Sequence, residues 1–207
     1  RDAEHLNELA ERQGLVLMVG HTFEYNPAVR LMKEIIASGD LGDVYYIDTV
    51  RVNLGLFQDH LNVLWDLAPH DVSILRYVLG CSPRQVSACG AACIFPDVVD
   101  LAYLYLEFPN RVIAHVHVSW LDPCKVRRIT VVGSKKMLVY DDVEPVEKVR
   151  IYDKGIEKPS YTHSYADFQL SYRNGDVLIP HLKLTEPLRI ECQHFVESIV
   201  NGTTPLS

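Results

Sequence analysis

The middle of the chain contains the run RVIAHVHVSW at residues 111–120, in which apolar side chains recur at every second position. A period of two is typical of a β-strand that packs one face against a core. Turn formers such as Pro109-Asn110 and Gly133-Ser134 separate this run from its neighbours. Further predicted strands cover residues 84–94, 98–108, 126–132, 136–140 and 147–152. Because short turns join consecutive strands, the sequence predicts a large, open and mainly antiparallel β-sheet.

Helical patterns lie on both sides of this strand-rich region. The predicted helices run from Pro27 to Ser38, from residue 63 to residue 79, and from Pro187 to Gly202. Residues 44–52 form one more β-type run, whereas residues 154–183 are expected to be irregular. The predicted fold class is therefore α+β, with helices packed on one face of the sheet.

Residues 1–20 have a different pattern. Residues 2–13 match an amphipathic helix, and Gly14 stands where a helix C-cap belongs. The apolar run LVLMVG at residues 15–20 follows at once and is typical of a strand in a parallel sheet. A helix followed by such a strand is half of an alternating α/β unit. We therefore expect residues 1–20 to end one domain and residues 21–207 to form a second one.

The composition argues against several classes of function. The formal net charge is -7 and the basic residues are scattered, which disfavours a nucleic-acid partner. No apolar run approaches the roughly 20 residues that span a bilayer. The start, RDAEH, lacks the plan of a signal peptide. We therefore expect a cytoplasmic protein without membrane contact.

The cysteines follow no spacing that builds a disulfide framework. There are five, an odd number, and only Cys89 and Cys93 lie close enough together to suggest a metal site. Both fall on one side of a strand-like stretch. We expect reduced, mostly buried thiols and no bound metal.

The segment NVLWDLAPHD at residues 62–71 is the sharpest candidate for chemistry. Asp66 and His70 are four residues apart, so on a helix they project from one face and can engage each other or one ligand. A carboxylate beside an imidazole raises its basicity, as a general base that removes a hydroxyl proton requires. Proline costs about 3 kcal/mol in a helix interior. Pro69 therefore predicts a helix entrance or a distorted turn. Taken alone, such a spacing is more often structural, with Asp66 as a helix cap and His70 partly buried.

Other candidates are weaker. His115 and His117 face one side of a strand and suit a sheet surface or an oligomer contact better than a metal site. The motifs of serine hydrolases, zincins, P-loop proteins and dinucleotide-binding turns do not occur in the sequence. Lys125 and Arg127 belong to the most basic short stretch, which either holds a pyrophosphate or is a solvated strand end.

Several segments in the same order resemble the Gfo/Idh/MocA oxidoreductases. They are VGHTF (19–23), NPAVR (26–30), SGDLG (38–42) and WDLAPHD (65–71). Within that family, one branch oxidises UDP-N-acetylglucosamine or UDP-N-acetylglucosaminuronate at C3. The segments that specifically resemble this branch are the same WDLAPHD (65–71), SWLDP (119–123), KVRR (125–128), EPLR (186–189) and HF (194–195). The resemblance covers essentially the whole chain.

This resemblance implies a Rossmann domain, ending with residues 1–20, and a substrate-binding, catalytic and oligomerisation domain at residues 21–207. His70 matches the histidine that takes the proton of the sugar hydroxyl as hydride passes to NAD, and Asp66 matches its companion carboxylate. The family's catalytic lysine and glycine-rich fingerprint have no counterpart here, so NAD is expected to be bound mainly by a missing N-terminal half. The implied substrate contacts are Tyr25, Asn26, Asn62, Lys125 and Arg127.

The implied activity is oxidation of a ring hydroxyl, at C3, of a UDP-N-acetyl-hexosamine or its uronate to a ketone, in polysaccharide biosynthesis. One alternative is a dehydrogenase of a free polyol or simple sugar, of the inositol or glucose type. Lys125 and Arg127 separate these two, because only a nucleotide sugar supplies a diphosphate. Another alternative is a non-catalytic relative that oligomerises or senses a ligand. Since one face of the sheet lacks a cover, we expect a homo-oligomer, a dimer or a tetramer, built through the sheet.

Overall fold

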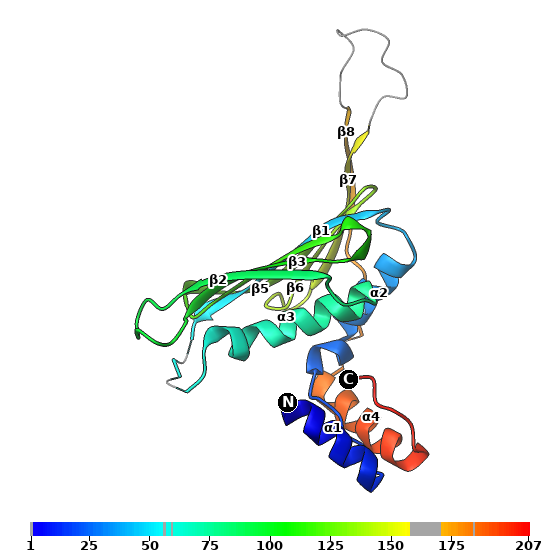
Figure 1. The fold of residues 1–207 in the computed structure, drawn as a ribbon. Coiled ribbons are helices and arrows are strands. Elements are labelled where there is room, and N and C mark those ends of the chain that lie inside the picture. The colour runs from blue at the N-terminus through cyan, green and yellow to red at the C-terminus, as the bar shows by residue number, and fades with distance from the viewer. Residues whose placement is uncertain (1, 56, 59, 158–170, 184) are drawn as a thin grey trace.

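The computed structural model describes residues 2–55, 57–58, 60–157, 171–183 and 185–207. Within these ranges one open sheet has the strand order β2-β3-β4-β1-β5-β6-β7-β8, with helices on one side of it (Figure 1). The strands are β1 (Val44–Leu54), β2 (Gln85–Ala91), β3 (Leu101–Glu107), β4 (Ile113–Ser119), β5 (Leu121–Gly133), β6 (Met137–Asp141), β7 (Val149–Glu157) and β8 (Ser171–Leu178). The helices are α1 (Asp2–Gln13), α2 (Pro27–Ala37), α3 (Val63–Leu79) and α4 (Pro187–Asn201), with short 3-10 turns η1 (Thr22–Tyr25) and η2 (Pro109–Arg111).

The sheet confirms the predicted α+β class and its mainly antiparallel pairing. Only the central pair, β1 with β4, is parallel among the described strands. After β1 the chain passes through helix α3 and strands β2 and β3 before it forms β4. β4 then pairs with one edge of β1, and β5 pairs with the other edge. Arg51 on β1 and Arg127 on β5 are direct cross-strand partners.

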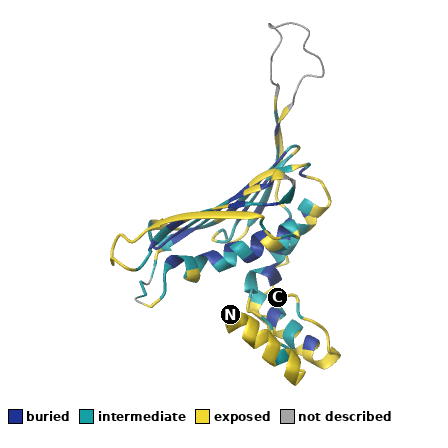
Figure 2. Ribbon diagram, viewed as in Figure 1, coloured by how far each residue is buried: buried dark blue, intermediate teal, exposed yellow. Residues whose placement is uncertain are grey.

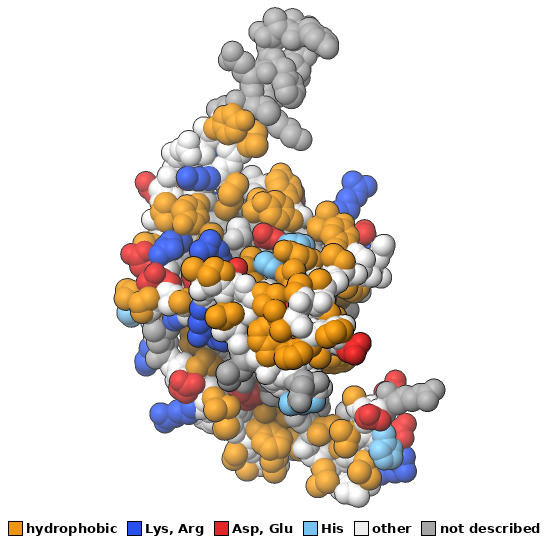
Figure 3. Space-filling model, turned by 90° about the vertical axis from the view of Figure 1, so that its left-hand side faces the viewer, with side chains coloured by type: hydrophobic (Ala, Val, Ile, Leu, Met, Phe, Trp, Pro, Cys, Tyr) orange, Lys and Arg blue, Asp and Glu red, His pale blue; other side chains and the backbone are white. Residues whose placement is uncertain are grey.

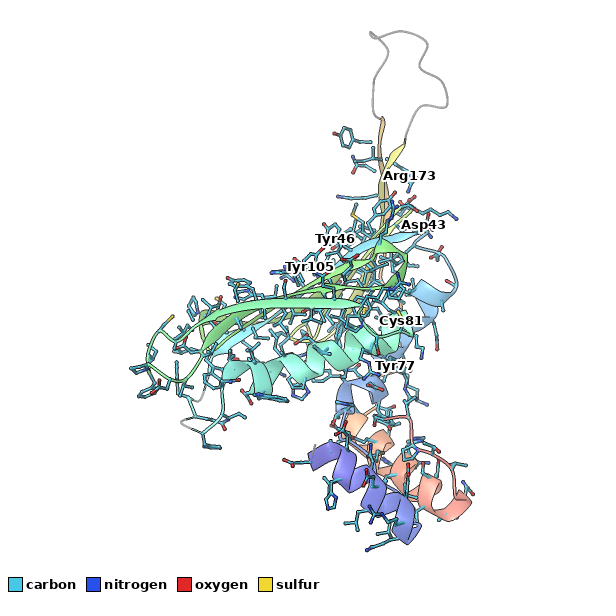
Figure 4. All side chains as sticks on the ribbon, viewed as in Figure 1. Asp43, Tyr46, Tyr77, Cys81, Tyr105 and Arg173 are labelled. Atoms are coloured by element: carbon cyan, nitrogen blue, oxygen red, sulfur yellow. The ribbon has the colours of Figure 1, made fainter. Side chains whose placement is uncertain are left out.

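The core lies between the sheet and the helices α2 and α3. Alternate residues of the inner strands face these helices, as Ile47 of β1 and Val116 of β4 do, and both are fully buried. The side chains between them face the other way. Figure 4 shows Tyr46 and Tyr105 on the side of the sheet away from α3, and both are exposed. The predicted uncovered face is therefore present in this chain (Figure 2).

Helix α3 follows directly from its sequence signals. Asn62 caps its first turn, because its side-chain oxygen accepts a hydrogen bond from the Trp65 amide over 3.1 Å, and Gly80 ends it in the left-handed conformation. The predicted helix over residues 63–79 is confirmed. The prediction that Pro69 marks a helix entrance or distorted turn is wrong, since the helix continues through it. Proline cannot donate to the Trp65 carbonyl, and packing of α3 on the sheet offsets that loss.

Two segments differ from the sequence prediction. Residues 171–178 form β8 and pair with β7, so the expectation of an irregular 154–183 is wrong there. This hairpin extends beyond the helices (Figure 1), and because no described residue of β8 is buried, this strand shows no hydrophobic alternation that would reveal it. Conversely, residues 15–20 join no ladder among the described residues, although α1 forms as predicted. A strand requires a neighbouring strand, and the backbone amide of Val19 bonds only to the Ser207 carbonyl at 3.3 Å.

The five cysteines are free thiols, as predicted, but the prediction that most are buried is wrong. Cys81 is half-buried, whereas Cys89, Cys93, Cys124 and Cys192 are exposed. Cys89 lies on β2, an edge strand whose residues are all exposed. In the described part of the chain no helix has the length and apolar character needed to cross a membrane.

Candidate functional site

A pocket of about 430 Å³ opens between α3 and the sheet, where β1 and β5 lie side by side. Its walls come from η1, β1, α3 and β5 and from the segment after β1. The lining residues are Phe23, Arg51, Asn53, Gly55, Gln58, Asp66, Leu67, His70, Trp120 and Arg127. The two residues singled out for chemistry, Asp66 and His70, are both among them.

Asp66 and His70 enter the pocket because α3 places them one turn apart on the same face. Asp66 does not point its carboxylate at His70. Its Oδ2 accepts a hydrogen bond from the indole nitrogen of Trp120 at 2.9 Å, and that tryptophan is only 1% exposed. A buried neutral donor therefore fixes one carboxylate oxygen, which leaves Oδ1 able to accept from a ligand hydroxyl.

His70 is half-buried and lies edge-on against the ring of Phe23, with 5.3 Å between centroids and an interplanar angle of 63°. Burial lowers the pKa of His70, and the nearby charge of Arg51 lowers it further, while Asp71 and Asp66 act in the opposite direction. Asp66 does raise the pKa of His70, as expected, but burial and the charge of Arg51 outweigh this effect. The result is a neutral imidazole at neutral pH, able to accept a proton.

Arg51 is a residue of the site that sequence reasoning missed. It sits on β1 with its side chain toward the helices, and both it and Asp71 are buried. Its Nε donates to Asp71 Oδ2 over 2.6 Å, and Nη2 donates to Oδ1 over 3.4 Å. A signal was available in the run Val50-Arg51-Val52, because a charged residue at an inward position of an apolar strand needs a partner or a ligand.

Arg127 is the one predicted substrate contact that lines the pocket. Its Nη1 lies 3.6 Å from Asp142 Oδ2, and its side chain is about one third exposed, at 34%. Asp142 is itself held by the Tyr140 hydroxyl, which donates to its Oδ1 at 2.9 Å. Arg127 is therefore steered by a carboxylate but keeps access to the pocket.

The other predicted contacts have different positions. Tyr25 is fully buried, with its hydroxyl near Met18 and Ser207. Asn26 caps α2 through the Ala28 amide and donates to the Tyr140 hydroxyl. Asn62 caps α3. Lys125 is exposed on β5 and is not part of the pocket wall. The first three have packing or capping partners, and none of the four reaches the pocket.

The described residues do not by themselves fit a dinucleotide. A pyrophosphate is held by a glycine-rich turn between a strand and a helix N-terminus. Here α2 and α3 begin at Asn26-Pro27 and Asn62-Val63, whose asparagine side chains already cap the helices. Nor do the described residues group three or more His, Cys, Asp or Glu side chains that could hold a metal ion.

Several solved structures share this open, mainly antiparallel sheet with helices on one face. UDP-N-acetylglucosamine 3-dehydrogenase GnnA from Acidithiobacillus ferrooxidans superposes with a TM-score of 0.71 at 21% identity, over 98% of this chain and 60% of that one. GenD2 from gentamicin A biosynthesis, solved in complex with NAD, superposes with a TM-score of 0.73 at 22% identity, over 99% of this chain and 60% of that one.

The chain belongs to the Gfo/Idh/MocA family, because the model of the GFO/IDH/MocA C-terminal domain matches residues 29–139. Among curated relatives it is 25% identical to scyllo-inositol 2-dehydrogenase (NAD(+)) of Bacillus subtilis over 99% of the chain, and 24% identical to the Acidithiobacillus UDP-N-acetylglucosamine 3-dehydrogenase over 74% of it. It spans 58% and 47% of the lengths of these two relatives.

Proposed function

We propose that this chain is the substrate-binding and catalytic portion of an NAD-dependent dehydrogenase. The substrate is a UDP-N-acetyl-hexosamine or its uronate, and the ring hydroxyl at C3 becomes a ketone, as a step of polysaccharide synthesis in the cytoplasm. The observation that carries the proposal is that one pocket is lined by a histidine, a carboxylate and an arginine, namely His70, Asp66 and Arg127. The histidine supplies a base, the carboxylate accepts a hydrogen bond from a substrate hydroxyl, and the arginine supplies a cation that binds an anionic group.

The chemistry assigned to this chain is removal of a proton. When an alcohol carbon becomes a ketone, it loses a hydride and its hydroxyl loses a proton, and NAD supplies the hydride acceptor. His70 takes the hydroxyl proton, because its lowered pKa keeps it neutral and ready as a base. Asp66 orients the same hydroxyl or its neighbour through the carboxylate oxygen that Trp120 leaves available.

The size and charge of the pocket support a sugar with an anionic substituent. Pockets of roughly 300–1,000 Å³ hold small ligands, and this one is at the smaller end. A sugar ring would occupy it, with the diphosphate passing Arg127 toward the exposed Lys125. Guanidinium groups bind phosphate oxygens in a two-pronged geometry, which suits Arg127 to this role.

NAD would be held by a dinucleotide-binding half. Residues 1–20 would form the end of that half, and residues 21–207 would form the domain that follows it. The length of the relatives beyond the matched region leaves room for such a half. Apolar side chains of α1, of residues 15–20 and of α4 are exposed, including Leu9, Leu17 and Val196, and a further domain would cover them.

The uncovered face of the sheet supports a homo-oligomer, a dimer or a tetramer. The rings of Tyr103 and His117 stack with 4.4 Å between their centroids, and His115 Nδ1 forms a hydrogen bond with Asp48 Oδ1 at 3.0 Å. The exposed Tyr105 and Ile113 lie on the same face. In the view of Figure 3, hydrophobic side chains surround histidines in this way on the surface.

A second candidate function is oxidation of a free polyol or simple sugar. The match to scyllo-inositol 2-dehydrogenase over 99% of the chain favours it, as does the partial neutralisation of Arg127 by Asp142. A non-catalytic relative remains the third reading, and the pairing of a neutral histidine with a carboxylate in one pocket counts against it.

The role of His70 is tested by His70→Ala in an enzyme that joins this chain to a dinucleotide-binding half. Loss of a general base should lower kcat by about 10²- to 10⁴-fold. Because the rest of the pocket remains, the Kd of the sugar, measured by calorimetry, should change by less than about threefold. The control is His181→Ala, an exposed histidine outside the pocket. Loss of binding equal to the loss of turnover would make His70 a structural residue.

A further inference from the structure

Arg51 is a buried charge on the central strand to which the proposed reaction assigns no role. Its residue is 4% exposed, and Asp71 is 1% exposed. Removing a charge from water costs several kcal/mol, so a buried guanidinium must be paired. The 2.6 Å bond to Asp71 meets that need, and Asp71 directly follows His70 in α3. The pair therefore fixes the helix to the sheet one residue away from the proposed base.

The same guanidinium also holds the aromatic ring that touches His70. Its Cζ lies 4.5 Å from the centroid of the Phe23 ring, within the range of a cation–π contact. Phe23 in turn meets the His70 ring edge-on. Arg51 thus restrains both neighbours of His70, the next helix residue Asp71 and the ring Phe23.

Arg51 has donors beyond those that Asp71 uses. A guanidinium has five N–H groups, and the two hydrogen bonds to Asp71 are the only ones recorded for Arg51 within the described residues. Arg51 lines the pocket together with His70, so its guanidinium charge lies beside the proposed base.

The charged groups that face His70 come from three elements. Arg51 of β1 and Arg127 of β5 oppose its protonation, and Asp66 and Asp71 of α3 favour it. Of the four, Arg51 has the largest effect on the pKa of His70 and lowers it. Within the pair, Arg51 and Asp71 therefore act on the pKa of His70 in opposite directions, and the effect of Arg51 is the larger one.

We propose that Arg51 is a positioning residue for the proposed general base: it holds the His70 ring through Asp71 and Phe23, and it places its own guanidinium charge beside that ring. The inference rests on the proposed role of His70. A pair that only pinned the helix could be replaced by apolar residues of similar volume without effect on His70, because such replacements of buried ion pairs are often neutral for stability. This contrast defines the test.

The test variant is Arg51→Met/Asp71→Leu, made in the enzyme that joins this chain to a dinucleotide-binding half. The control is Arg128→Met/Asp141→Leu, an ion pair between β5 and β6, 3.6 Å apart, with Arg128 exposed and outside the pocket. NMR follows the titration of the His70 imidazole, and kcat/KM for a UDP-sugar is measured against pH. In the test variant we expect His70 to titrate at higher pH and the acid limb to move with it, because Arg51 outweighs Asp71. The kcat should fall roughly 10- to 100-fold, with little change in KM. The control should match the wild type.

An unchanged His70 titration in the test variant would overturn the proposal, whatever happens to kcat. If that variant does not fold, Arg51→Lys decides instead. Lysine keeps the charge but lacks the planar fork, so His70 should still titrate low while kcat falls. A wild-type kcat in Arg51→Lys would overturn the positioning role. The NMR titration needs no turnover, so it tests Arg51 even if no sugar is oxidised and the proposed function fails.

Discussion

Asp66 and His70 are adjacent on one helix face but are held by different neighbours, and this separation determines what each can do. The carboxylate is fixed by an indole N–H, and the imidazole by a phenyl ring and a buried ion pair. A local spacing of four residues predicts the shared face. It cannot predict Trp120 or Arg51, which are distant in sequence and reach the pocket only when the sheet assembles.

Trp120→Phe tests the first of these contacts. The substitution keeps an aromatic ring in the core but removes the donor to Asp66. Hydrogen bonds to charged groups contribute about 1.5–3 kcal/mol. We therefore expect kcat/KM to fall roughly tenfold or more, since 1.4 kcal/mol corresponds to a factor of ten. Steady-state kinetics provide the measurement, with Trp65→Phe, an exposed tryptophan at 73%, as the matched control. Equal kinetics in the two variants would show that the indole does not orient Asp66.

The elements that position the site were largely predictable. The helix over residues 63–79 and the strand alternation are local patterns, and both appear in the structure. The parallel pairing of β1 with β4 was not predictable, because it depends on a crossover and not on any local signal. The prediction of a helix entrance or distorted turn at Pro69 was wrong for a related reason. The intrinsic penalty of proline in a helix is outweighed by the packing of α3 on the sheet.

The uncovered face of the sheet carries a prediction at this scale. Tyr103 lies on that face, on the second strand from one edge of the sheet, and its ring stacks on those of His117 and His115. If a second copy covers it, Tyr103→Glu buries an unpaired charge in the interface and should convert the oligomer to a monomer. Light scattering coupled to size exclusion measures the mass. Val146→Glu, at a position 79% exposed in a loop, should leave the mass unchanged. A wild-type protein that is already monomeric would contradict the sheet-to-sheet contact.

At the scale of the whole molecule, the described chain has a sheet region with its own hydrophobic core and a helical end, formed by α1 and α4, that contributes no residue to this core. Helix α1 has no buried residue, whereas the sheet and the helices α2 and α3 share one continuous core. The sequence predicts a domain boundary at residue 20, which stays a prediction, and the proposed dinucleotide-binding half would cover the helical end, to which α4 also belongs. What the sequence could not show is the pocket itself, because its walls come from segments as far apart as Phe23 and Arg127.

The central claim is that this pocket oxidises the sugar of a nucleotide sugar. The most direct measurement joins the chain to a dinucleotide-binding half and follows NADH absorbance with UDP-N-acetylglucosamine, its uronate, free inositol and glucose as separate substrates. We predict NADH formation with the UDP-sugars alone, and its loss with the uncharged Arg127→Met. Turnover of the free polyols would move the substrate to the second candidate, and no turnover with any of the four would contradict the catalytic assignment.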